Sequence, residues 1–178
     1  MTHFAREYGN ALFELAMEEG LAEEIAGQLA VLKGCFAEEP AYIRLLCARN
    51  VELEARKRLL DEAFGGRLHP YLLNFLKLLT GRGAMEEFAG CADVYRMRYN
   101  EAHGIAEATA ESAAPLTQAQ AEALTRKLKE MTGKRIVLHQ KVNPELIGGL
   151  RVDLEGRRYD NSIRTRIDRL RRTLIESE

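Results

Sequence analysis

The stretch GIAEATAES, residues 104–112, marks the point where the hydrophobic pattern of the chain changes its period. Before it, apolar residues recur every three or four positions, which is typical of α-helices. From it onward, short segments alternate apolar and polar residues, as RIVLHQKV (135–142) and GLRVDL (149–154) do, and this alternation is typical of β-strands. The pattern therefore predicts an α+β fold, with an all-helical domain over residues 1–104 and a small α+β domain over residues 105–178.

The N-terminal half predicts six helices joined by short loops, which we interpret as a six-helix bundle. The helices are expected at residues 4–19, 21–36, 41–48 and 51–64, from residue 70, and at about residues 84–101. Asn50 is an acceptable N-cap for the fourth helix, and Gly65 with Gly66 would end it. Pro70 suits the first turn of the fifth helix.

The C-terminal half predicts a short sheet of three strands and two helices. Thr117, with Gln120 three residues later, has the pattern of a capping box and would begin a helix that Gly133 ends. The last helix is expected to carry one apolar stripe. That stripe consists of Ile163, Ile167, Leu170 and Leu174.

The glycine pair in NPELIGGLRVDLEG, residues 143–156, raises the question of a phosphate site. A phosphate-binding loop leads from a strand directly into a helix, because the free N–H groups of the helix hold the anion. Gly148 and Gly149 instead precede the alternating segment LRVDL. The sequence therefore predicts a turn or bulge that uses the positive φ of glycine, and not a nucleotide site.

Other patterns of catalytic or metal-binding residues are missing from the sequence. The three cysteines form no CxxC pair, and the four histidines lack the spacing of metal ligands. Acidic pairs such as Glu18 and Glu19 are neighbours on a helix, so their side chains diverge and cannot face one substrate. We expect a protein that has no catalytic residue, metal ligand or cofactor, with reduced and buried cysteines.

Hydropathy limits where the protein can be located, and charge indicates which kinds of partner it can bind. No segment approaches the roughly 20 apolar residues of a membrane-spanning helix, and the N-terminus lacks the order of a signal peptide, so we expect no direct membrane insertion. Residues 1–104 carry a charge balance of −4, and residues 105–178 one of +3. The two halves are therefore expected to meet different partners.

The fifth helix, within HPYLLNFLKLLTGRG (69–83), has more apolar residues than one buried stripe needs. One interpretation is a central helix that its own bundle buries on all sides. The other is a groove for a partner's amphipathic helix, to which the first helix would contribute small residues beside aromatic and aliphatic ones. These first-helix residues are Ala5, Gly9, Ala11 and Ala16, with Tyr8, Leu12 and Phe13.

Opposite its apolar stripe, the last helix carries a basic face. The face consists of Arg164, Arg166, Arg169, Arg171 and Arg172. Such a face could attract phosphates, anionic lipid or an acidic protein. A nucleic-acid-binding adapter is the alternative function, but the face lacks aromatic residues for base stacking, so we expect no nucleic acid partner.

Six motifs follow one another along essentially the whole chain. They are YGNALFELA (8–16), NFLKLL (74–79) followed by TGRG, SAAPLT (112–117), TGKRIVL (132–138), VNPELIGGLRV (142–152) and DNSIRTRIDRL (160–170). In this order and spacing, they resemble the delta subunit of bacterial F-type ATP synthases, the family of the mitochondrial oligomycin-sensitivity-conferring protein.

The resemblance implies a non-catalytic connector in the peripheral stalk of the synthase, present in one copy at the cytoplasmic face of the energy-coupling membrane. It implies that residues 1–104 bind the N-terminal helices of the α subunits, and that residues 105–178 bind the C-terminal end of the b subunits. The positions that match α-subunit contacts are Tyr8, Ala11, Asn74 and Leu78. On the stalk side, the candidate contacts are Arg164, Arg169 and Arg172 of the basic face.

Three positions depart from the pattern of this family. Ala84 stands where a second arginine is usual, which leaves any contact of that arginine open. Gly9 stands where alanine is usual, and we expect it to loosen the first helix by up to about 1 kcal/mol. Asn161 replaces a glycine, which asparagine can do where the backbone is left-handed.

Overall fold

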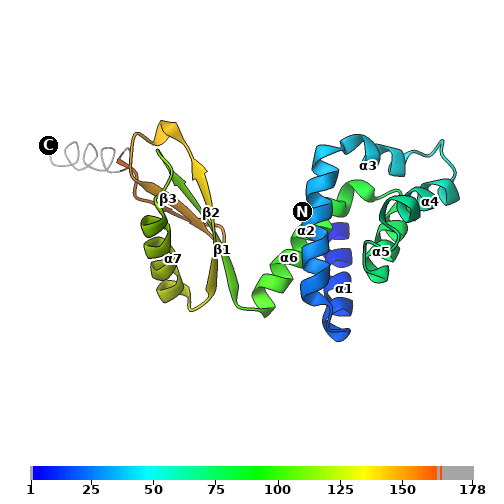
Figure 1. Cartoon of the computed structure of the whole chain (residues 1–178), viewed down its shortest axis with the longest axis horizontal. Coiled ribbons are helices and arrows are strands. Elements are labelled where there is room, and N and C mark those ends of the chain that lie inside the picture. Colours follow the sequence, from blue (N-terminus) through cyan, green and yellow to red (C-terminus); the bar gives the residue numbers. More distant parts are fainter. Residues whose placement is uncertain (1, 164, 166–178) are drawn as a thin grey trace. The chain divides into compact units, whose positions relative to one another are not determined.

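The computed structural model of the chain describes residues 2–163 and residue 165. Its contacts divide the chain into two compact units, Met1–Tyr99 and Asn100–Glu178. Within the described residues the fold is mixed α+β, with seven α-helices and one four-stranded sheet (Figure 1). Each unit has its own hydrophobic core, so each is described separately.

The N-terminal unit is built from α-helices and one short 3-10 helix. The helices are α1 (His3–Glu18), α2 (Ala22–Glu38), α3 (Pro40–Cys47), α4 (Leu53–Phe64), α5 (Pro70–Gly81) and α6 (Phe88–Ala102), with the 3-10 helix Met85–Glu87 directly before α6. Pro70 lies in the first turn of α5, and Gly65 is the C-cap of α4, as the sequence predicts.

The predicted N-cap of the fourth helix, Asn50, is wrong. Helix α4 begins later, with Glu52 at its N-cap position. The residues before it form a turn, which Arg56 holds by donating hydrogen bonds to the carbonyl oxygens of Leu46 and Val51 at 2.8 and 3.1 Å. These bonds satisfy two carbonyl oxygens, and the turn that they hold places the start of the helix after Asn50.

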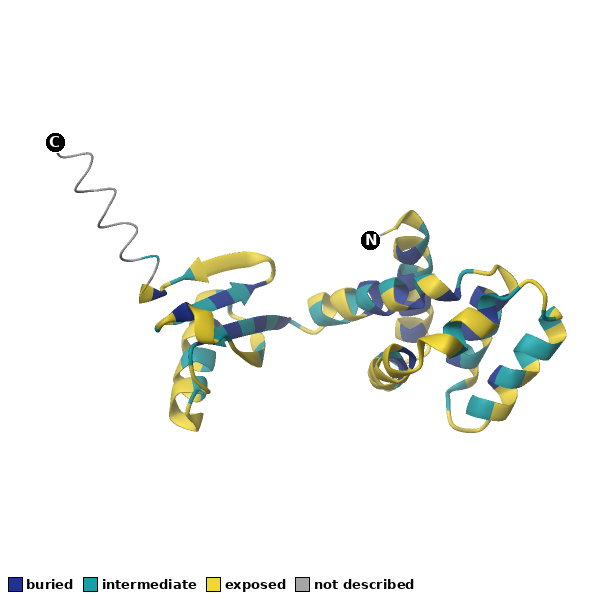
Figure 2. Ribbon diagram, turned by 90° about the horizontal axis from the view of Figure 1, so that it is seen from above, coloured by how far each residue is buried: buried dark blue, intermediate teal, exposed yellow. Residues whose placement is uncertain are grey.

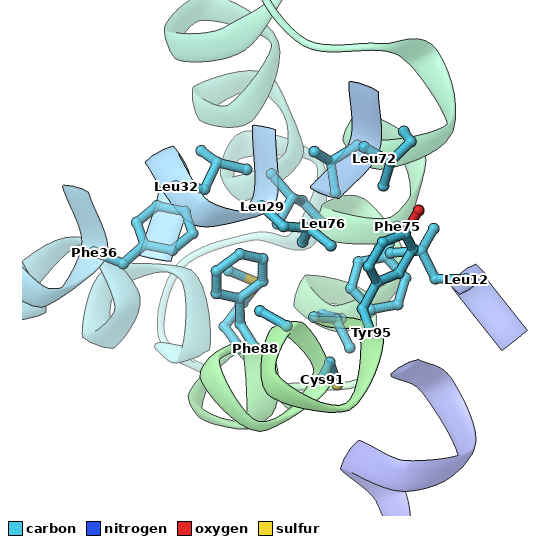
Figure 3. Close-up of a cluster of buried hydrophobic side chains, with 14 of the residues drawn as sticks. Leu12, Leu29, Leu32, Phe36, Leu72, Phe75, Leu76, Phe88, Cys91 and Tyr95 are labelled. Carbon is cyan, nitrogen blue, oxygen red and sulfur yellow. The ribbon is translucent and has the colours of Figure 1, made fainter. Parts of the chain in front are cut away.

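The core of the N-terminal unit is aliphatic and aromatic, and all six α-helices contribute to it (Figures 2 and 3). Phe36 packs edge to face against Phe88, with ring centroids 5.0 Å apart. The fully buried Tyr95 donates a hydrogen bond from its hydroxyl to the carbonyl oxygen of Ala22 at 3.0 Å. This bond satisfies the polar end of a buried ring, so Tyr95 stabilises the packing of α6 against α2.

Helices α1 and α6 cross at unusually short range. A Cβ atom placed on Gly9 would lie 2.7 Å from the carbonyl oxygen of Cys91 and 2.7 Å from Cβ of Val94. A Cβ atom placed on Gly90 would lie 2.9 Å from Cβ of Ala5. The glycine at position 9 therefore permits the crossing. The expected loosening of the first helix stays a prediction.

The C-terminal unit is a sheet with the strand order β2-β1-β3-β4. Its elements are β1 (Ile105–Ser112), α7 (Gln118–Thr132), β2 (Arg135–Val142), the 3-10 helix Pro144–Leu146, β3 (Leu150–Leu154) and β4 (Arg157–Asp160). Strand β1 pairs in parallel with β2 and antiparallel with β3, and β3 pairs antiparallel with β4. The parallel pairing requires a crossover connection, and α7 provides it.

Strand β4 was not predicted. It is short and polar, and it follows a two-residue turn in which Glu155 and Gly156 have φ values of 49° and 80°. Two positive φ values in succession are typical of the tight turn that joins two strands of a hairpin. The sheet therefore has four strands where the sequence predicts three.

Helix α7 covers one face of the sheet. The predicted capping box is confirmed, since Thr117 and Gln120 exchange both hydrogen bonds, and Gly133 ends the helix with a φ of 70°. Leu128 of α7 is buried with Val152 and Leu154 of β3 in a small core. Side chains alternate along each strand, so the other face of the sheet carries the intervening polar residues.

The glycine pair at residues 148 and 149 accommodates the segment after β4. Gly149 has a φ of 88°, which confirms the predicted turn, and a Cβ atom there would lie 2.6 Å from the carbonyl oxygen of Asn161. A Cβ atom on Gly148 would lie 2.7 Å from Cδ1 of Ile163. Asn161 itself does not have a positive φ, so a left-handed backbone is not what allows asparagine at this position.

Candidate partner-binding surfaces

Tyr8 lies at the edge of the N-terminal core, half-buried on α1. Its ring stacks on Phe4 with centroids 4.0 Å apart and an interplanar angle of 17°. The guanidinium carbon of Arg82, which follows the last residue of α5, lies 5.8 Å from the centroid of the Tyr8 ring. This cation–π contact connects the candidate residue on α1 with the end of α5.

Most of the surplus apolar surface of α5 is buried within its own unit. The buried residues of this helix are Leu72, Phe75, Leu76, Leu79 and Thr80. Leu78 is the exception, with 44% of its surface exposed, and Asn74, one turn before it, is also exposed. The interpretation of α5 as a helix buried by its own bundle therefore accounts for most of its leucines, but not for Leu78.

The small residues of α1 are also mostly buried. Ala5, Gly9 and Ala16 are buried inside the unit, where α6 packs closely against the first two. Ala11 is exposed, and Leu15, one turn later, is 37% exposed. The surface that α1 and α5 leave accessible to a partner is therefore smaller than the sequence suggests. It consists of Tyr8, Ala11 and Leu15 on α1, and of Asn74 and Leu78 on α5.

The stalk-side candidates Arg164, Arg169 and Arg172 lie outside the described residues, as does the rest of the predicted basic face. The described chain leads up to them through Asp160 and Ser162. A carboxylate oxygen of Asp160 accepts a hydrogen bond from the backbone N–H of Ser162 at 2.9 Å, and the hydroxyl oxygen of Ser162 accepts one from the backbone N–H of Thr165 at 3.3 Å.

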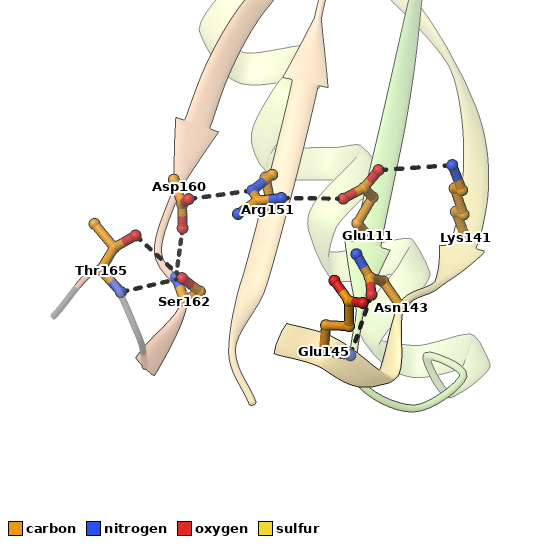
Figure 4. A network of polar contacts seen from close by, with 8 residues as sticks. All are labelled: Glu111, Lys141, Asn143, Glu145, Arg151, Asp160, Ser162 and Thr165. Atoms are coloured by element: carbon orange, nitrogen blue, oxygen red, sulfur yellow. Dashed lines mark hydrogen bonds and ion pairs between the residues drawn. The ribbon is translucent and has the colours of Figure 1, made fainter. Parts of the chain in front are cut away.

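Asp160 ends a row of alternating charges that crosses all four strands (Figure 4). Lys141 of β2 lies 4.0 Å from Glu111 of β1, and Arg151 of β3 lies 3.4 Å from Glu111 and 3.1 Å from Asp160 of β4. Hydrogen bonds from Ser162, and then from Arg151, hold the pKa of the Asp160 carboxyl well below its usual range. These cross-strand pairs of opposite charge stabilise the observed register on the polar face of the sheet.

A hollow on the other side of the sheet was not foreseen from the sequence. It has a volume of about 720 Å³ and lies between α7 and β2, one of the two edge strands of the described sheet. Leu116, Ala121 and Leu138 supply its apolar lining, and Arg126 with Lys129 its positive charges. No local signal could reveal it, because strand order decides which residues of β2 lie next to α7.

The titratable and membrane-related features of the described residues are few. Burial raises the pKa of the Cys91 thiol to about 11, which leaves it protonated and unreactive at neutral pH. The expectation of buried cysteines is wrong for Cys35, which is exposed, and Cys47 is half-buried. In the part of the chain that the structure describes, no three His, Cys, Asp or Glu residues gather as a metal site would require. None of the helices within the same residues is both long and apolar enough to cross a membrane.

Comparisons with known proteins agree over nearly the whole chain. The family model described as "ATP synthase delta (OSCP) subunit" matches residues 4–174. The ATP synthase subunit delta of Desulfitobacterium hafniense is 34% identical over 170 residues, covering 96% of this chain and 95% of that protein. The ATP synthase subunit delta of Geobacillus sp. (strain WCH70) is 35% identical over 172 residues, covering 96% of both.

A solved structure supports the fold independently. A chain of the cryo-EM structure of the Toxoplasma gondii mitochondrial ATP synthase hexamer aligns with a TM-score of 0.77 at 16% identity, covering 98% of both chains. The family model and the relatives define the class of protein: a non-catalytic structural subunit of ATP synthase that is part of its peripheral stalk. The chain belongs to the ATP synthase delta (OSCP) subunit family.

Proposed function

We propose that this chain joins the N-terminal helices of the α subunits to the C-terminal end of the b subunits, so that the catalytic head resists the torque of the rotor. The observation that carries the proposal is the division of the chain into two units with separate cores and opposite charge balance. A connector needs two independent binding surfaces and a stiff body, and it needs no bond chemistry.

The N-terminal unit, as a six-helix bundle over about residues 1–104, would bind an α-subunit helix. Support comes from the exposed residues Ala11, Asn74 and Leu78 beside the half-buried Tyr8, which remain accessible after the core of the unit has formed. An amphipathic helix laid across α1 and α5 would bury these residues by the helix-in-groove mode. Well-placed anchors at its centre would supply most of the affinity.

The C-terminal unit, over about residues 105–178, would bind the b subunits. Support comes from its positive charge balance, which differs in sign from that of the N-terminal unit. One copy of the chain at the cytoplasmic face of the energy-coupling membrane would suffice, since a single outer link can hold the head. The nucleic-acid-binding adapter has no support from the fold or the relatives.

The experiment that tests the proposal is capture from the membranes of the source cell with the tagged full chain. We expect both α and b subunits to be recovered, with the α subunits lost on Tyr8→Asp and the b subunits retained. Recovery of neither subunit, with a folded chain, would refute the connector role. Recovery that the Tyr8 change lowers equally for both subunits would refute the two-surface arrangement.

A further inference from the structure

The hollow between α7 and β2 has an apolar lining and a positive rim. Leu116 and Ala121 line it from the α7 side and Leu138 from β2, while Val142, on the same face of β2 as Leu138, is 47% exposed. The apolar surface that remains open here is thus larger than the lining alone. Each of its boundaries is formed by described elements, α7 on one flank and the sheet edge on the other.

The charges of the hollow determine the chemistry of its occupant. Arg126 and Lys129 are three residues apart on α7, so they lie on one face of the helix, and within the described residues neither pairs with a carboxylate of this chain. Glu122, the one acid in the lining, already accepts a hydrogen bond from the side-chain amide of Gln118 at 3.0 Å. Covering these cations with a neutral surface would be unfavourable, whereas carboxylates on the partner would offset their desolvation.

The edge strand argues for a helix as the occupant. Strand β2 pairs only with β1 among the described strands, and a free edge could in principle accept an added strand. Its exposed cations Arg135 and Lys141 oppose that mode, since charged side chains on an edge disfavour strand addition. A helix would instead lay one apolar stripe against the lining of the hollow and leave the backbone of β2 unpaired.

We propose that this hollow is the site where the C-terminal unit holds the stalk, and that its occupant is an acidic amphipathic helix with an apolar stripe flanked by carboxylates. The proposal rests on the proposed function, in which this unit binds the b subunits. It assigns the binding to Arg126, Lys129 and the lining of α7 and β2, which are separate from the predicted basic face of the terminal segment.

The test uses the full chain and two probes. One is a synthetic peptide of about 18 residues, long enough to form a helix when bound, with leucines on one face and glutamates beside them. The other is the set of b subunits captured from membranes. The double variant Arg126→Glu/Lys129→Glu should weaken binding of the peptide at least about tenfold by titration calorimetry and reduce capture of the b subunits in proportion.

Lys127→Glu is the matched control, because Lys127 is exposed on the same helix but does not line the hollow. It should change the dissociation constant less than about twofold. A peptide with lysines in place of the glutamates should prefer the double variant to the unchanged chain. Circular dichroism and the thermal midpoint check that each variant is folded.

Three outcomes with the peptide would overturn the inference. They are equal binding of the acidic peptide by the double variant and the unchanged chain, an equal loss of binding with Lys127→Glu, and a bound peptide that stays non-helical while the amides of β2 gain exchange protection. If the unchanged chain captures no b subunit, the proposed function fails. The peptide titration would then still test whether the hollow binds an acidic amphipathic helix. If the double variant captures b subunits normally, the connector role stands and this location for it is wrong.

Discussion

At the scale of single residues, Gly9 shows how a missing side chain sets the approach of two helices. A Cβ atom there would overlap the carbonyl oxygen of Cys91 and the side chain of Val94, so we expect Gly9→Ala to lower the free energy of unfolding by about 1–3 kcal/mol, although alanine favours helices. Gly27, on α2, has no atom within 4 Å of its Cβ position. Gly27→Ala should therefore raise the same free energy by up to about 1 kcal/mol. Urea denaturation measures the free energy of unfolding of both variants. Changes of the same sign in the two variants would contradict this account.

Tyr8 is the residue on which the N-terminal surface can be tested most directly. Tyr8→Asp would place a charge where the proposed function has a partner helix bury the aromatic ring, so we expect the binding of an α-subunit N-terminal peptide to weaken by about 2–4 kcal/mol. Tyr8→Phe keeps the ring and its contacts with Phe4 and Arg82, and should bind nearly as the unchanged chain does. Titration calorimetry measures the affinity of both variants for the peptide. Unchanged affinity in a folded Tyr8→Asp variant would reject the assignment of this surface.

At the scale of secondary structure, local patterns predicted the elements well where they depend on nearby residues. Strand β2 has the predicted bounds, and the capping box of α7 is present, because alternation and capping are determined within a few positions. The start of α4 was missed because the turn before it is held by the Arg56 side chain and not by a cap residue. Strand β4 was missed because it is short and polar and has no apolar alternation. The contact of Arg82 with Tyr8 and the hollow beside α7 could not be predicted, because they bring together residues that are far apart in the sequence.

The free energy of unfolding should depend on pH through Asp160, at the end of β4. The pKa of Asp160 is lowered in the folded chain, so its ionised form stabilises the fold above the ordinary carboxyl pKa of about 4, and this contribution is lost as the pH falls below that value. We expect Asp160→Asn to lower the free energy of unfolding by about 1–2 kcal/mol at pH 7. The difference from the unchanged chain should shrink below about pH 4. A difference that is constant between pH 7 and pH 3 would contradict this role of the carboxylate.

At the scale of the whole molecule, the two separate cores predict that the units can be separated. A fragment of residues 1–104 includes all of α6 and the complete core of the N-terminal unit, so it should fold cooperatively on its own. We expect it to keep its affinity for an α-subunit peptide within about threefold and to capture no b subunit. Thermal denaturation and capture from membranes check this. A fragment that recovers both partners would refute the proposed assignment of one partner to each unit.

The central position of β1 has a consequence for how the protein is made. Its neighbours in the sheet are β2 and β3, and its pairing with β3 reaches Leu154. On the ribosome, the helical unit can begin to fold as soon as α6 has emerged, whereas β1 must wait until some 40 further residues have been translated before both its edges are covered. The second half of the protein is therefore the part that needs protection from aggregation during synthesis.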